Sequence, residues 1–281
     1  MAKVYEAMRR AEEERKRRAG SEPSPVAPVE WEPLVQTVTP SKSSLWKRMF
    51  GRSRPRAQRD AANEINKRRI ALLQPDSYVA EQYRSLRGRL DAIEAQRPLR
   101  TLVVTSPMPG EGKTTAAVNL ACVSSLSVGR KVLLIDCDLR RPQVHKTLGL
   151  RPETGLAEVL MDRATLDDSI VSVEGVNLDV LPVRSLPGNP SELLGSEKMQ
   201  TLIEDASGRY DRIVFDTPAA LGLPDAKVVC DLCDGLILVV RADVTSQHDV
   251  QATLETLDRR RVLGMILNGT PAEQGRYGYS S

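Results

Sequence analysis

Strongly apolar runs alternate with helical segments from residue 78 onward, and this alternation restricts the possible folds more than any other feature. The runs are LRTLVVTS, KVLLIDCD, VNLDVLPV, YDRIVFDTP, DGLILVVR and VLGMILN. Helical segments such as TTAAVNLACVSSL, PSELLGSEKMQTLIEDA and SQHDVQATLETLDRR separate them. Buried strands that alternate with helices are typical of a parallel sheet covered on both faces. We therefore predict a doubly wound α/β domain with a mostly parallel sheet, whose ligand binds at the carboxyl ends of the strands.

A phosphate-binding loop is predicted between the first apolar run and the helical segment that follows it. Residues 106–115 read SPMPGEGKTT, in which Gly110 and Gly112 allow the backbone to approach a ligand closely. Backbone N–H groups in such a loop cradle phosphate oxygens, and the helix N-terminus adds partial positive charge. We expect Lys113 to reach the β- and γ-phosphates and Thr114 to bind Mg²⁺. The predicted nucleotide-binding residues are Ser106, Pro109, Gly110, Glu111, Gly112, Lys113, Thr114 and Thr115.

Carboxylates at two strand ends support this interpretation. The alternative is a glycine-rich turn with a surface lysine, because Pro107 occupies the usual first glycine position of the motif. Two aspartates end the run KVLLIDCD and one ends YDRIVFD, where Mg²⁺ and its waters would need oxygen ligands. Singly, each aspartate could instead cap a helix or a turn. The predicted catalytic residues are Lys113, Asp136, Asp138 and Asp216, and the predicted metal-binding residues are Thr114, Asp138 and Asp216.

These motifs together resemble those of the bacterial tyrosine kinases of the polysaccharide-biosynthesis type, or BY-kinases. That family has a P-loop fold related to the chromosome-partitioning ATPases. The resemblance covers about residues 75–281. It rests on SxxPxxGKT (Ser106, Pro109, Gly112, Lys113, Thr114), DxDxR (Asp136, Asp138, Arg140), a Walker B strand (Asp216, Thr217, Pro218) and ExxRxxR (Glu81, Arg84, Arg87).

The resemblance implies an ATP- and Mg²⁺-dependent protein-tyrosine autokinase that regulates exopolysaccharide synthesis or export. It implies that Asp136 accepts the tyrosine proton, although the residues alone do not separate its role from that of Asp138. It also implies that Asn268 contacts adenine, whereas an ordinary turn residue at a strand end would look the same. The helix with Glu81, Arg84 and Arg87 would assemble a homo-oligomer; a solvated basic face is the alternative. The implied partner is a membrane-bound polysaccharide co-polymerase or chain-length regulator.

The tail of the chain holds the expected phosphoacceptors, Tyr277 and Tyr279. Tyr277 lies nine residues past Asn268, so an extended tail reaches about 30 Å from the sheet, enough to enter a neighbouring subunit. The family normally ends in a larger tyrosine cluster. The short tail therefore leaves two alternatives open: a disordered end without function, and an ATP-driven switch of the partitioning-ATPase type without significant kinase activity. DxDxR and the tail tyrosines favour the kinase.

The chain divides into three parts, with a short charged helix at 1–19, a disordered basic linker at 20–77 and the kinase domain with its tail at 78–281. Residues 1–100 carry 22 Lys/Arg and 13 Asp/Glu, whereas residues 101–281 carry 18 and 24. Nucleic-acid binding would rest on this charge alone and is not expected. No apolar run reaches the roughly 18 residues of a membrane span, and the four cysteines lack disulfide-type spacing. We expect a cytoplasmic protein that is recruited to the inner face of the plasma membrane.

The linker contains a candidate membrane-surface segment at residues 42–59. Leu45, Trp46, Met49 and Phe50 can share one face of a short helix, and Lys and Arg residues surround them. Apolar and aromatic groups beside clustered cations suit an anionic bilayer surface, where each cation contributes roughly 1 kcal/mol. A disordered basic linker that packs on the kinase domain or on a partner is the alternative.

This hypothesis predicts binding to anionic but not to neutral liposomes. Co-sedimentation and Trp46 fluorescence should both report the interaction, and Trp46→Ala with Phe50→Ala should weaken it. Equal binding to both lipids, or no loss in the double variant, would contradict a membrane role for this segment.

Overall fold

The computed structural model describes residues 74–270. The helix expected at 1–19, most of the linker, the membrane-surface segment and the tyrosine tail at 271–281 lie outside the described residues. Within residues 74–270, no helix is long and apolar enough to cross a membrane. The elements are α4 (Tyr78–Glu94), β1 (Thr101–Thr105), α5 (Lys113–Ser125), β2 (Val132–Asp136), α6 (Val144–Leu148), α7 (Leu156–Leu160), α8 (Leu166–Ser169), β3 (Val171–Ser172), β4 (Leu178–Leu181), α9 (Pro190–Leu194), α10 (Glu197–Arg209), β5 (Arg212–Asp216), α11 (Asp225–Leu232), β6 (Gly235–Arg241), α12 (Gln247–Thr256), a 3-10 turn (Arg259–Arg261) and β7 (Val262–Asn268).

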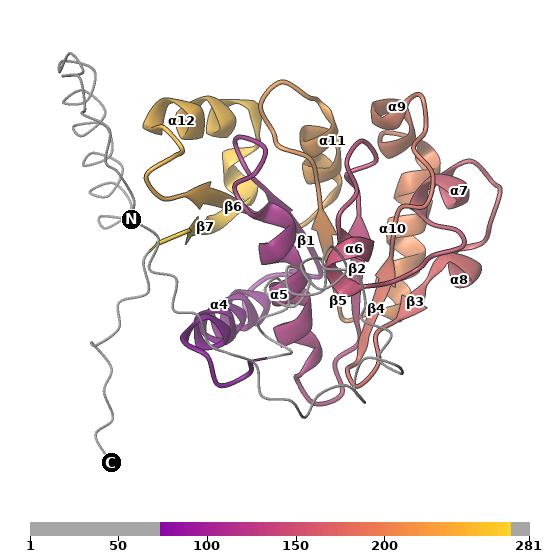
Figure 1. The fold of residues 1–281 in the computed structure, drawn as a ribbon, viewed down its shortest axis with the longest axis horizontal. Coiled ribbons are helices and arrows are strands. Elements are labelled where there is room, and N and C mark those ends of the chain that lie inside the picture. The colour runs from indigo at the N-terminus through magenta and orange to yellow at the C-terminus, as the bar shows by residue number, and fades with distance from the viewer. Residues whose placement is uncertain (1–73, 271–281) are drawn as a thin grey trace, which may run out of the picture.

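The sheet has seven strands in the order β3-β4-β2-β5-β1-β6-β7, and every neighbouring pair except β3–β4 is parallel. The predicted doubly wound, mostly parallel sheet is confirmed (Figure 1). All six apolar runs form strands. The antiparallel edge strand β3 was not predicted, because its two residues are partly exposed and carry no apolar run.

Each central strand contributes alternate side chains to two separate cores. Val104 packs in the core on the α4 and α5 side, whereas its neighbour Val103 packs in the core with α10 and α11. Strands buried on both faces therefore read as continuous apolar runs, which explains the pattern in the sequence. The four cysteines are all buried and form no disulfide, consistent with the absence of disulfide spacing.

The segment PSELLGSEKMQTLIEDA, expected as one helix, forms the two helices α9 and α10. The break follows from local chemistry, because the Ser196 hydroxyl accepts a hydrogen bond from the Met199 backbone N–H (3.3 Å) and so caps α10. A side chain that satisfies the free N–H groups of a new helix favours a start at that position.

The position of β5 determines where the site forms. β5 lies between β1 and β2, with Asp216 in register with Val104 on one side and with Asp136 on the other. Parallel strands end at the same edge of a sheet. The P-loop after β1, the aspartates after β2 and Asp216 are therefore brought together, although they are distant in the sequence.

Candidate active site

The P-loop has a backbone conformation that requires its glycines. Gly110 and Gly112 have φ values of 85° and 98°, a region that other residues rarely adopt. A Cβ atom on Gly112 would also lie 2.1 Å from Nδ2 of Asn268. Gly112 is the N-cap of α5, so the free N–H groups of this 13-residue helix begin at the loop. The loop therefore has the features of a phosphate cradle.

Side chains from distant parts of the chain brace this loop from within. Glu111 is only 2% exposed, and its Oε2 accepts a hydrogen bond from the Met108 N–H (3.0 Å). The hydroxyl of Thr245 donates to the other carboxylate oxygen, Oε1. Burial raises the pKa of Glu111. The Ser106 hydroxyl donates to the Met108 carbonyl (2.8 Å). Neither Glu111 nor Ser106 borders the cavity, and both side chains are engaged in hydrogen bonds within the protein, so their contact with a nucleotide stays a prediction.

Asn268 and Arg241 support the loop from the ends of β7 and β6. Nδ2 of Asn268 donates to the Glu111 carbonyl (2.9 Å), and a guanidinium N–H of Arg241 donates to the Gly110 carbonyl (3.4 Å). The structure thus gives Asn268 a role in holding the loop, while its contact with adenine stays a prediction. Sequence reasoning missed Arg241 and Thr245, because 131 and 134 positions separate them from their partners and no motif links them.

A cavity of about 640 Å³ opens beside the P-loop at the carboxyl edge of the sheet. Three segments line it, each following a central strand. They are the P-loop (Pro109, Gly110, Gly112, Lys113, Thr114, Thr115), the loop after β2 (Asp138, Arg140, Arg141, Gln143) and the loop after β5 (Pro218, Ala219, Leu221, Leu223). The wall after β5 is apolar and the other two are polar, so the cavity suits a ligand with both kinds of surface.

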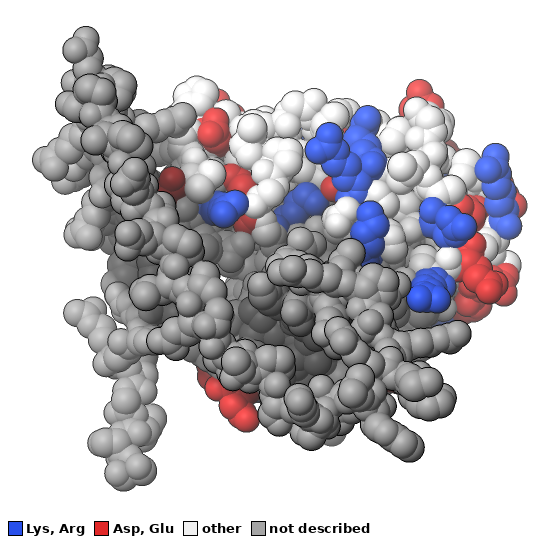
Figure 2. Space-filling view, in the orientation of Figure 1, with Lys and Arg blue, Asp and Glu red and all other residues white. Residues whose placement is uncertain are grey.

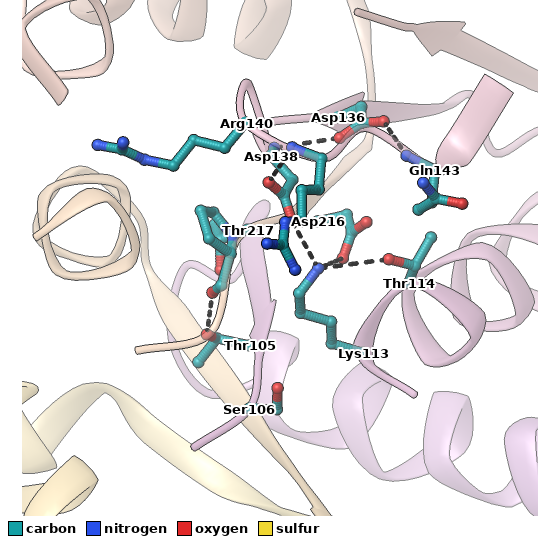
Figure 3. Close-up of polar contacts among 12 residues, drawn as sticks. Thr105, Ser106, Lys113, Thr114, Asp136, Asp138, Arg140, Gln143, Asp216 and Thr217 are labelled. Atoms are coloured by element: carbon teal, nitrogen blue, oxygen red, sulfur yellow. Dashed lines mark hydrogen bonds and ion pairs between the residues drawn. The ribbon is translucent and has the colours of Figure 1, made fainter. Parts of the chain in front are cut away.

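Lys113 occupies the centre of this polar region (Figure 3). Its Nζ lies 3.0 Å from Oδ2 of Asp138, 3.9 Å from Oδ1 of Asp216 and 3.5 Å from Oγ1 of Thr114. Burial lowers the pKa of Lys113, but the carboxylates of Asp216 and Asp138 outweigh that effect and raise it. A nucleotide phosphate would compete with these carboxylates for the ammonium group, so binding must rearrange the pair.

Asp136 is fully buried beneath this pair. Its carboxylate accepts hydrogen bonds from the backbone N–H groups of Asp138 (3.1 Å), Gln143 (3.2 Å) and Val144 (3.1 Å). Burial, together with nearby Asp216, raises its pKa to about 8. Asp136 therefore shapes the loop after β2, whereas Asp138 borders the cavity itself.

The residues present fit a magnesium ion held together with a nucleotide. Both carboxylate oxygens of Asp216 are buried without a hydrogen-bond partner among the described residues. Burial raises the Asp216 pKa to about 6, and Lys113 and the Thr114 hydroxyl oppose that rise. Residues 74–270 contain no group of three His, Cys, Asp or Glu that would hold a metal unaided. Mg²⁺ characteristically binds through one or two protein oxygens, waters and the substrate's own phosphates.

Arg140 fastens the loop after β2 to two helices. Its guanidinium donates to both carboxylate oxygens of Asp225 (2.7 and 3.4 Å) at the start of α11, and to the Ser191 hydroxyl (3.2 Å) in α9. Asp225 is buried and also accepts from Ser191. Bidentate pairs of this kind fix orientation as well as charge. The DxDxR motif identified Arg140, but nothing in the sequence identified Asp225 as its partner.

The residues expected to form a subunit contact all have partners within the chain. Arg84 donates to Glu81 in the first turn of α4 and to the carbonyl of Pro75, which precedes the helix. Arg87 donates to the Val123 carbonyl of α5 (2.7 Å), one of the last carbonyls of that helix, which lack helical partners. Arg87 therefore ties α4 to α5, while Glu81 and Arg84 form an exposed pair that a neighbour could contact.

Comparisons with known proteins identify relatives of this site and fold. A family model described as an AAA domain matches residues 100–262. The chain is 35% identical to the tyrosine-protein kinase YwqD of Bacillus subtilis over 225 residues, which cover 79% of this chain and 94% of that protein. It is also 33% identical over 253 residues to the succinoglycan biosynthesis transport protein ExoP of Rhizobium meliloti. That alignment covers 87% of this chain but only 32% of ExoP.

A solved structure shows the same likeness in three dimensions. The kinase domain of the Escherichia coli tyrosine kinase ETK superimposes with a TM-score of 0.67 and is 32% identical. The match covers 75% of this chain and 83% of that domain. Sequence and fold therefore agree on the same group of enzymes.

The buried Asp136 predicts a pH dependence of stability in the nucleotide-free protein. Its folded pKa of about 8 lies above the value of 3.8 for an unburied aspartate, so the folded state binds the proton more tightly. This stabilising contribution is complete below pH 4 and is lost as the pH rises through 8, at no more than about 1.4 kcal/mol per pH unit. Asp136→Asn cannot ionise, and its free energy of unfolding should fall less between pH 6 and 8.

Urea denaturation in EDTA at several pH values measures this effect. Glu204→Gln, which changes an exposed carboxylate on α10, is the control and should keep the wild-type slope. Identical slopes for Asp136→Asn and wild type would contradict a buried, protonated Asp136.

Proposed function

The chain belongs to the AAA-domain P-loop proteins and, within them, to the bacterial tyrosine-protein kinases, and we propose that its cavity binds Mg-ATP and transfers the γ-phosphate to protein tyrosine. The observation that carries the proposal is Lys113, held by Asp138 and near Asp216 at the mouth of a glycine-constrained P-loop. Phosphoryl transfer needs positioned positive charge more than covalent catalysis. The kinase names of the relatives favour this function over an ATP-driven switch.

The proposed reaction uses the geometry in a defined order. Lys113 would leave Asp138 for the β- and γ-phosphates, and Thr114, Asp138 and Asp216 would hold Mg²⁺ and its waters. When bound, Mg²⁺ would neutralise charge on the phosphates. Asp136 is proposed to accept the tyrosine proton, a role that requires its ionised form and access to the substrate hydroxyl. Asp138 borders the cavity and Asp136 does not. Asp136→Asn should therefore keep the affinity for ATP, whereas Asp138→Asn should raise the Mg²⁺ concentration that half-maximal activity requires.

Lys113→Met tests the assignment most directly. Loss of its charge should reduce tyrosine phosphorylation by at least about 100-fold, the effect of removing one transition-state donor. Anti-phosphotyrosine detection after incubation with Mg-ATP measures transfer, and circular dichroism checks that the fold is kept. Lys131→Met, which changes an exposed lysine at the opposite edge of the sheet, is the matched control. Full activity in Lys113→Met would refute the proposed site.

Tyr277 and Tyr279 are the proposed phosphoacceptors. The described tyrosines offer little competition, because burial raises the pKa of Tyr83 to about 12, and the Tyr210 hydroxyl donates to Asp179 (2.8 Å). Tyr78 alone among the described tyrosines is largely exposed. Mass spectrometry of the wild type and of Tyr277→Phe with Tyr279→Phe should find phosphate on the tail of the former and little phosphate on the latter. Phosphate confined to Tyr78 would contradict the tail assignment.

The partners are proposed from the relatives. ExoP is named for biosynthesis and transport of a polysaccharide, which supports a kinase that regulates exopolysaccharide synthesis or export from the inner face of the plasma membrane. A membrane-bound co-polymerase or chain-length regulator would be its partner. In this proposal the exposed start of α4 mediates a homo-oligomer.

Self-association should depend on Glu81 and Arg84. Glu81→Ala with Arg84→Ala removes the exposed pair and should lower the oligomer mass in light scattering, since the pair would contact the neighbour. Arg87→Ala should act differently, because it loosens α4 from α5 and lowers stability in the monomer as well. A wild-type protein that remains monomeric with Mg-ATP at high concentration would count against a subunit contact at α4.

A further inference from the structure

Three exposed cations follow β2 and β4 at the edge of the sheet where the active-site cavity opens. Arg141 borders the cavity, Lys146 lies on α6, and Arg184 follows β4 at the carboxyl edge of the sheet. Figure 2 shows Lys and Arg side chains gathered around the position of α6. We call Arg141, Lys146 and Arg184 the cationic rim.

Lys146 and Arg184 lie on neighbouring connections, because β2 and β4 are adjacent parallel strands and end at the same edge of the sheet. His145 precedes Lys146 in α6, and burial lowers its pKa, followed by the positive charges of Lys146 and Arg184. Arg184 is 39 positions away in the sequence, so only the fold brings it near. Because Gln143 both lines the cavity and precedes α6, the rim continues directly from the cavity wall.

The rim is not neutralised within the part of the chain that the structure describes. The side chains of Arg141, Lys146 and Arg184 form no ion pair or hydrogen bond among residues 74–270. The nearby aspartates are paired with other cations, Asp138 with Lys113 and Asp225 with Arg140. Glu158 accepts a hydrogen bond from the Ser185 hydroxyl at one oxygen, while its other oxygen is buried without a hydrogen-bond partner among the described residues. Adjacent unpaired positive charges repel one another, so an anionic ligand would be favoured there.

The opposite wall of the cavity suits the ring of a tyrosine. Pro218, Ala219, Leu221 and Leu223 form an apolar surface that faces the polar P-loop side. A tyrosine bound with its ring on this wall can direct its hydroxyl toward the phosphates. The residues on either side of the tyrosine would then lie at the entrance, next to Arg141.

We propose that the cationic rim selects, among other proteins, acceptor tyrosines that Asp or Glu residues flank, in contrast to the chain's own tail, where Arg276 and Gly278 flank Tyr277. This inference rests on the proposed function and specifies its substrate class. Exposed charge pairs each contribute modestly, about two- to fivefold in affinity, so the three together should give about tenfold. Salt screens such pairs, so the preference should shrink in 0.5 M NaCl.

The test uses the full chain and three synthetic peptides with one tyrosine, flanked on both sides by Glu, by Gln or by Lys. For the wild type, the KM of the Glu peptide should lie about tenfold below that of the Gln peptide, and the KM of the Lys peptide should be the highest. Lys146→Gln with Arg184→Gln should reduce the difference between the Glu and Gln peptides to about twofold. The KM for ATP should not change in this variant, whereas a general loss of structure would change it.

The matched control is Arg97→Gln with Lys131→Gln, which removes one arginine and one lysine that are exposed near the opposite edge of the sheet. It should keep the wild-type preference. Equal KM values for the Glu and Gln peptides in the wild type, or an equal loss in the control, would overturn the inference. Transfer to the tail tyrosines but to no peptide would also overturn it. Absence of phosphate on every tyrosine would instead refute the proposed kinase activity itself.

Discussion

The pairing of β5 with both β1 and β2 is the constraint on which the site depends. Asp216 lies in register with Val104 and with Asp136, so three strands end together and bring their loops around one cavity. A different strand order with the same helices and strands would separate the P-loop from its carboxylates. The hydrogen bonds of the central sheet thus set the positions of Lys113, Asp138 and Asp216, whereas the loops supply only their final orientation.

This arrangement gathers more negative than positive charge in a buried place. Asp136 and Asp216 are fully buried and Asp138 nearly so, yet Lys113 is the cation that the structure places among them. Burial disfavours the ionised form of a carboxyl group, and it raises the pKa values of both Asp136 and Asp216. A divalent cation would offset this excess of negative charge, whereas the phosphates that accompany it would be met by Lys113 and by the backbone N–H groups of the P-loop. Arg140 does not offset the charge of these carboxylates, because it is paired with Asp225.

The P-loop is held in place by residues from β6, β7 and the loop after β6, the part of the sheet next to β1. Thr245, Arg241 and Asn268, at or just after the ends of β6 and β7, all contact the loop at residues 110 and 111. These contacts preorganise the phosphate cradle before a ligand arrives. They also connect the loop to the strands nearest the tail of the chain. In contrast, the loop after β2 is anchored to α9 and α11 through Arg140.

The sequence by itself determined the doubly wound fold, the P-loop and the aspartates at the strand ends, because apolar periodicity and a glycine-rich motif act over short distances along the chain. It missed the two-residue strand β3 and the break between α9 and α10, where local capping by Ser196 prevails over helical composition. Only the tertiary structure decided that Asp138 borders the cavity while Asp136 is buried, that Arg87 is occupied by α5, and that Glu111 braces the loop from inside. It alone placed the connection with Arg184 next to that with Lys146, because β2 and β4 are neighbouring strands. Each of these depends on which groups the packing of distant elements leaves accessible to solvent, a property that no local pattern encodes.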